Sequence, residues 1–336
     1  RVARVWRQFH AHQVYGADSL SVMRSGARWL TLVSLGWALA RWRRLRPRSL
    51  LDNAPLEKLL AKMVPLMRLP RLIQKGHLTA LAVTASSYSS GEHVTFYESA
   101  QAVPPWVRSQ RKAARDRITH EHLLASSAIP FVFPAKGITI DGHTEYFGDG
   151  SMRQSAPIAA AIHLGAERVL VIGAGRMHEP RGDSTAPPSP SYPSLAQIAG
   201  HALSNIFLDA LSVDVERVQR INQTLSLIPE EKRTHSALRP VELLVIAPSQ
   251  RLDAIAARHV GDLPGPVRTM LGALGVTSNM ADVRGAALAS YLLFEQGYTQ
   301  ELMALGRADT LARRADVCRF FGWKDTGAAL RTRLPA

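Results

Sequence analysis

The chain carries the stretch A-S-S-A-I-P at residues 125–130 and, beyond a short predicted hairpin, F-G-D-G-S at residues 147–151. The pair Asp141-Gly142, with apolar residues on both sides, predicts that hairpin over residues 138–147. Asp149 therefore follows a strand and stands between two glycines. Glycine lets the backbone take a positive φ or approach another element closely, so such a turn can project a carboxylate. Taken alone the signal is weak, because Asp-Gly is also a very common hairpin turn.

The order of these stretches is more specific than either stretch alone. They are followed by a proline-led helical pattern at residues 157–164 and by the apolar run R-V-L-V-I-G at 168–173. In this order they resemble the second half of a patatin-like phospholipase domain of the bacterial type, over roughly residues 78–173. The resemblance implies that Asp149 is the base of a Ser–Asp catalytic dyad and that Gly150 lets the turn approach the nucleophile. Ser151 stands at a third motif position, where Gly or Ala is more usual.

The nucleophile of that family lies in G-x-S-x-G, and its oxyanion loop is rich in glycine. Neither string occurs in the 336 residues, so we expect the chain to begin after the nucleophile region and to be inactive as given. Ser126 and Ser127 end a predicted helix, where their hydroxyls are expected to bond backbone groups. The serines at 86–90 lie in a predicted hairpin turn and lack the strand–turn–helix elbow of a reactive serine.

The activity that the resemblance implies is hydrolysis of acyl lipids, phospholipids or other carboxylic esters, in lipid metabolism. A serine hydroxyl needs an adjacent base, and a partly buried carboxylate can accept its proton. No metal or organic cofactor is implied. The alternative is a catalytically inactive, truncated relative that binds lipid or a protein partner.

The histidines give no metal-site signal. His10 and His12, like His120 and His122, are spaced i,i+2, which on a helix points the two rings apart. The single cysteine, Cys318, excludes an internal disulfide and a Cys-rich metal site.

The charge balance favours an anionic partner. Lys and Arg number 41 against 27 Asp and Glu, a formal charge of +14, which attracts anionic lipid surfaces. Residues 27–48 join a tryptophan-rich apolar run, too short to span a bilayer, to a cluster of arginines. We expect this segment to be a lid that packs on the core or lies at an anionic membrane surface.

No nucleic-acid-binding module is present. The oligomeric state is not indicated, and the location is expected to be the cytoplasm or the membrane surface.

The fold class follows from the alternation of elements. The apolar runs at 168–173 and 242–247 are typical of buried parallel strands, and helical patterns separate them. We predict an α/β fold, a three-layer α/β/α sandwich with a mainly parallel central sheet. Residues 1–250 are predicted to form the patatin-like domain, including the lid-like segment, and residues 251–336 a helical C-terminal extension.

Overall fold

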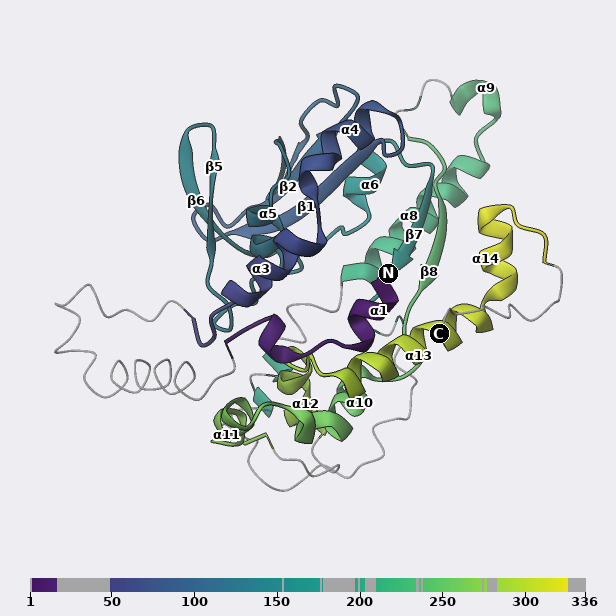
Figure 1. The fold of residues 1–336 in the computed structure, drawn as a ribbon. Helices are drawn as coiled ribbons and strands as arrows, with labels where there is room; N and C mark the ends of the chain where they lie inside the picture. The colour runs from purple at the N-terminus through teal and green to yellow at the C-terminus, as the bar shows by residue number, and fades with distance from the viewer. Residues whose placement is uncertain are drawn as a thin grey trace.

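The computed structural model of the protein describes residues 2–16, 49–152, 154–175, 177, 197–198, 200–202, 210–233, 236, 238–273, 275–276 and 283–325. The lid-like segment predicted at 27–48 lies outside the described residues. Figure 1 shows a twisted sheet with helices against it, a smaller strand pair beside it, and a group of helices below. The fold is therefore mixed α/β.

The elements follow one another along the chain with these bounds: α1 (Val2–Arg7), η1 (Ala11–Gln13), α3 (Ala54–Met63), η3 (Leu66–Arg68), α4 (Leu69–Gln74), β1 (Ala80–Ser87), β2 (His93–Ser99), β3 (Val107–Arg108), β4 (Arg111–Arg115), α5 (His120–Ser126), β5 (Lys136–Ile140), β6 (His143–Asp149), α6 (Ala159–His163), β7 (Arg168–Ile172), α8 (Ala210–Ser226), α9 (Glu230–Arg233), β8 (Glu242–Ile246), α10 (Leu252–His259), η4 (Val260–Asp262), α11 (Gly265–Ala273), α12 (Val283–Ser290), α13 (Gln296–Ala312) and α14 (Arg314–Phe321).

The main sheet has six strands in the order β3-β4-β2-β1-β6-β5. Only β2 and β4 run parallel in it, and the other four neighbouring pairs are antiparallel. The prediction of a mainly parallel central sheet was therefore wrong. The reason is the short connections: β1–β2, β3–β4 and β5–β6 are each joined by a tight turn, and a tight turn permits only antiparallel pairing.

The two apolar runs that suggested a parallel sheet form a separate pair. β7 and β8 are parallel, from Arg168 opposite Glu242 to Ile172 opposite Ile246. Their burial is less complete than predicted. Val169 packs against α8, whereas Leu170 and Ile172 point the other way and are 41% and 79% exposed. Among the described residues, only one face of β7 is well covered.

The β5–β6 hairpin, which ends at Asp149, is confirmed. Asp141 and Gly142 have φ of 50° and 81°, the two positive values that a type I′ turn requires. Ile140 lies opposite His143, and the ladder continues to Lys136 opposite Phe147. The turn chemistry at its tip thus sets the register of the strand that carries Asp149.

Alternating residues give the main sheet two different faces. On one face Val83, Ala85, Val94, Phe96 and Phe147 pack against α4 and α5. The opposite face is more polar, with the hydroxyls of Thr84 and Thr95 3.3 Å apart. Helix α6 reaches this second face, because the ring of His163 stacks on Trp106, which stacks on Tyr97.

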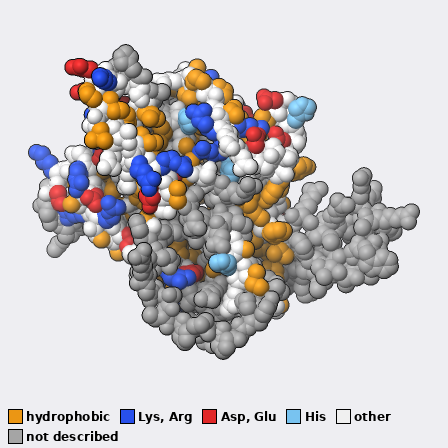
Figure 2. All heavy atoms as spheres, turned by 180° about the vertical axis from the view of Figure 1, so that it is seen from behind, with side chains coloured by type: hydrophobic (Ala, Val, Ile, Leu, Met, Phe, Trp, Pro, Cys, Tyr) orange, Lys and Arg blue, Asp and Glu red, His pale blue; other side chains and the backbone are white. Residues whose placement is uncertain are grey.

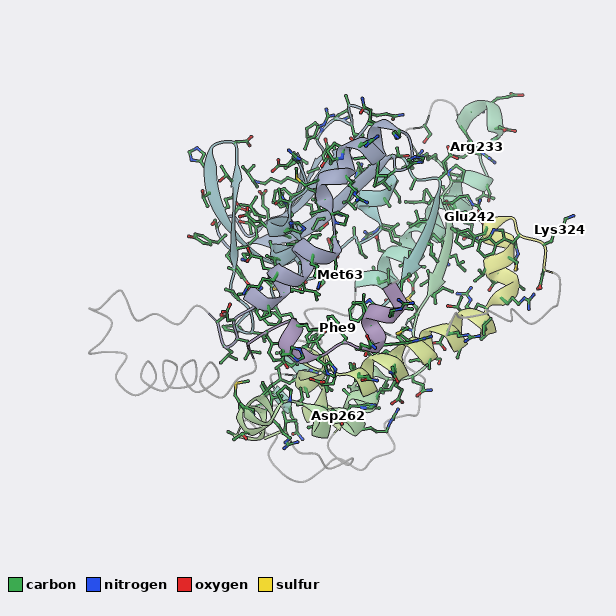
Figure 3. The ribbon with its side chains drawn as sticks, viewed as in Figure 1. Phe9, Met63, Arg233, Glu242, Asp262 and Lys324 are labelled. Atoms are coloured by element: carbon green, nitrogen blue, oxygen red, sulfur yellow. The ribbon has the colours of Figure 1, made fainter. Side chains whose placement is uncertain are left out.

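The largest core joins the two ends of the chain. Helices α10 to α13 contribute to it together with Phe9 and Tyr15, and Figure 3 shows Phe9 close to α13. The Tyr15 hydroxyl donates to the carbonyl of Leu292 at 2.8 Å. The same core takes in Ile129, Val132 and Phe133 of the α5–β5 loop. This loop is therefore held between the helices and the sheet, and it borders the end of β6.

Candidate active site

Asp149 is fixed at the end of β6 by backbone contacts on two sides. Its register partner on β1 is Ala85. Its N–H donates to the carbonyl of Ala128 at 3.0 Å, and the N–H of Gly150 donates to the carbonyl of Ser126 at 3.2 Å. The A-S-S-A stretch and the G-D-G-S stretch, which are about twenty residues apart in the sequence, are thus hydrogen-bonded to each other in space.

Gly150 is required by a close approach of two backbones. A Cβ at this position would lie 1.8 Å from the carbonyl oxygen of Thr84 and 2.5 Å from its carbon. No side chain fits there without movement of the main chain. The absence of a Cβ therefore lets the turn lie directly against β1.

The carboxylate of Asp149 is partly occupied. Its Oδ1 accepts hydrogen bonds from the Ser151 N–H at 2.8 Å and from the Ser151 hydroxyl at 2.5 Å. Its Oδ2 accepts none from the part of the chain that the structure describes. Burial raises the pKa of Asp149, and the two Ser151 hydrogen bonds oppose that rise. A raised pKa makes a carboxylate a better proton acceptor.

Tyr88 lies beside Asp149 and was not singled out from the sequence. Its ring covers Gly148: a Cβ on that glycine would lie 2.4 Å from the tyrosine hydroxyl. The Tyr88 N–H donates to the carbonyl of Tyr146. Burial, and then the charge of Asp149, raise the pKa of Tyr88, so its hydroxyl stays protonated. A half-exposed phenol thus borders the carboxylate. The one sequence signal for Tyr88 was its position in the predicted turn after β1.

The serines near Asp149 take part in local structural hydrogen bonds. The Ser127 hydroxyl donates to the carbonyls of Leu123 at 2.9 Å and Leu124 at 3.3 Å, so its predicted structural role is confirmed. Ser87 donates to Glu145 at 2.7 Å and accepts from two N–H groups of its own turn. Ser126 contributes the carbonyl that holds Gly150.

The histidine pairs differ from each other. His120 Nε2 contacts the Val64 carbonyl, while His122 Nδ1 bonds Thr119, so these two rings do point apart. The prediction for His10 and His12 was wrong, because their rings stack with centroids 5.5 Å apart. Helix α1 ends at Arg7, so these two histidines do not share the regular helix that the spacing argument assumes. Within the described ranges no three His, Cys, Asp or Glu side chains gather to form a metal site.

Comparison with known families gives a match over residues 11–162 to the family described as patatin-like phospholipase. This segment, slightly less than half of the chain, is thus similar to a patatin-like phospholipase domain. The match begins at η1 and ends within α6, so it includes the whole six-stranded sheet and Asp149. No curated protein and no solved structure was found to match the chain. The patatin-like family consists of serine esterases, so the match implies lipid acyl hydrolase activity and a lipid substrate.

Proposed function

We propose that this chain carries the base half of a Ser–Asp dyad that hydrolyses acyl esters of lipids, with Asp149 as the base. The observation that carries the proposal is the state of the Asp149 carboxylate. It is partly buried and its pKa is raised by burial. Among the described residues, Ser151 engages its Oδ1 and no hydrogen-bond donor engages its Oδ2. The backbone bonds to Ser126 and Ala128 hold it in place.

The chemistry follows from that geometry. Oδ2 accepts the proton of the attacking serine while the serine oxygen bonds the ester carbonyl carbon. The proton then passes to the leaving alcohol, which departs and leaves an acyl-serine. Water attacks this acyl group and gives a proton to Asp149. As the bond between the serine oxygen and the acyl carbon breaks and the fatty acid leaves, Asp149 returns that proton to the serine oxygen. Fixing one carboxylate oxygen with Ser151 leaves the other to exchange protons, so positioning and proton transfer are shared between the two oxygens.

We also propose a division of the chain into two parts and a contact with the membrane surface. We place the patatin-like domain at residues 1–250, as three α/β/α layers, with a helical extension at 251–336. The helices α4 and α5 on one face of the sheet, and α6 on the other, support the layers. Peripheral contact with anionic membranes is proposed through residues 27–48, supported by the net charge of +14. No helix among the described residues is long and apolar enough to cross a membrane.

The test needs a form of the protein that contains a G-x-S-x-G segment as well as the 336 residues. Asp149→Asn in that form should fold and lose most of its turnover of a short-chain nitrophenyl ester and of a phospholipid. Asn is close to isosteric but is a poor proton acceptor. Asp141→Asn is the matched control, because Asp141 precedes a glycine in the hairpin turn of β5–β6. Near-normal turnover by the Asp149→Asn variant would reduce Asp149 to a turn residue.

A further inference from the structure

Phe131 occupies a backbone position that its side chain disfavours. Its φ is +65°, in the left-handed region where a bulky residue is a rare outlier. It follows Pro130, and the N–H of Val132 donates to the carbonyl of Ile129. Proline at the second position and a positive φ at the third are typical of a type II turn, whose third residue is ordinarily Gly or Asn. Glycine is the favoured residue at this third position of the turn, but the residue there is Phe131.

The ring of Phe131 gains little from the interior to offset that strain. It is 72% exposed, whereas Ile129, Val132 and Phe133 are all below 10%. The neighbours on both sides are thus anchored in the core shared with the helices. Phe131, the residue in the strained conformation, is thus far more exposed than these three apolar neighbours.

The backbone around the ring is held firmly. The N–H of Leu50 donates to the Phe131 carbonyl at 2.8 Å, and that of Leu51 to the Val132 carbonyl at 2.9 Å. Strained positions persist where the surrounding contacts over-determine them, and they concentrate at functional sites. The same loop supplies the Ala128 and Ser126 carbonyls that hold Asp149 and Gly150. Phe131 is therefore presented rigidly to solvent from the loop that anchors the candidate base.

We propose that Phe131 is a lipid-contacting wedge, which inserts its ring among the acyl chains at the surface of an anionic membrane. The choice of lipid rests on the proposed function, since an acyl hydrolase must meet its substrate at such a surface. The formal charge of +14 of the whole chain favours an anionic surface. On the face of the molecule seen in Figure 2, Lys and Arg side chains lie among hydrophobic and acidic ones. Transfer of an exposed aromatic ring into hydrocarbon is favourable.

The experiment measures co-sedimentation of the 336-residue chain with vesicles of equal parts phosphatidylglycerol and phosphatidylcholine. Phe131→Gly should lower the partition coefficient by about tenfold or more, which is the effect of withdrawing one large apolar side chain from lipid. This variant relieves the strain at φ +65°, so it is expected to fold. Leu227→Ala is the matched control, because Leu227 is 80% exposed and lies between α8 and α9 rather than in the α5–β5 loop. It should change the partition less than twofold.

A second measurement locates the ring directly. The chain has one cysteine, so Cys318→Ser combined with Phe131→Cys gives a single site for an environment-sensitive dye. Its emission should shift to the blue on vesicles, and a dye at Leu227→Cys should not respond. Unchanged emission at position 131, equal binding by Phe131→Gly, or no binding by the wild-type chain would each overturn the proposal. A change from dimer to monomer in Phe131→Gly without lipid would also overturn it, in favour of a second copy as the partner.

The outcome is separable from that of the proposed function. Asp149→Asn should bind vesicles as the wild type does, because the carboxylate takes no part in insertion. Phe131→Gly should leave turnover of a soluble short-chain ester unchanged in the form that carries a nucleophile. Loss of vesicle binding with intact ester turnover supports the wedge. Loss of ester turnover in Phe131→Gly would instead place Phe131 in the catalytic site and overturn it.

Discussion

Gly150→Ala should be the most damaging single-methyl change near the candidate site. The new Cβ would lie 1.8 Å from the Thr84 carbonyl oxygen, and real Cβ atoms essentially never come within 3.0 Å of another heavy atom. The difference means that one backbone must move by about 1.2 Å, and overpacking of this kind costs about 1–3 kcal/mol or more. The movement also strains the bond from the Gly150 N–H to the Ser126 carbonyl, which contributes about 1 kcal/mol net. We expect a loss of about 3 kcal/mol in the free energy of unfolding.

The assay is urea unfolding followed by circular dichroism, with two glycine controls. Gly306→Ala, within α13, meets nothing within 4 Å and should stabilise the protein by about 0.5–1 kcal/mol, since alanine favours a helix. Gly142→Ala also meets open space but has φ +81°, so it should cost about 1 kcal/mol from backbone strain alone. If Gly150→Ala unfolds at the same urea concentration as the wild type, the close approach to Thr84 is not real. A loss no larger than that of Gly142→Ala would likewise refute the steric argument.

Three further outcomes follow from the same structure. Burial raises the pKa of Asp149 above its ordinary 3.8, so folding stability falls as the pH rises from about 3.8 to the folded-state pKa and stays lower above it. Asp149→Asn should therefore unfold at a higher urea concentration than the wild type at pH 7, and a gain that persists at pH 3 would contradict this. Burial lowers the pKa of His122 from 6.5, so the stability that its neutral ring confers should be lost as the pH falls below 6.5. His122→Gln preserves a capping box and should flatten that pH dependence in unfolding experiments between pH 5 and 7; an equally steep profile would exclude His122 as its cause. Phe131→Gly should raise the free energy of unfolding by about 1 kcal/mol by relieving the left-handed strain, and a lower urea midpoint would show that the ring stabilises the fold.

Local chemistry in the sequence determined several elements of this protein. Asp141-Gly142 predicted a hairpin, because two residues with positive φ match the twist of the paired strands, and that hairpin is present. The apolar runs at 168–173 and 242–247 predicted two strands that run parallel, and β7 and β8 pair in that way. The ordered string from residue 125 to residue 173 indicated the patatin-like family, and the match over residues 11–162 supports it. Each of these signals lies within a short window of the chain, where turn geometry and side-chain periodicity act directly.

Only the tertiary structure decided how these elements meet. The mostly antiparallel sheet arises because the strands with tight turns pair with one another, and β7 and β8 do not join them. The contact of Gly150 with Thr84, and of Asp149 with Ala128, joins segments that the hydrophobic pattern alone does not bring together. The exposure of Phe131 depends on how its buried neighbours dock on helices from the far end of the chain. Sequence periodicity records which face of an element is apolar, but not which other face covers it, and that pairing is set by packing between distant parts of the chain.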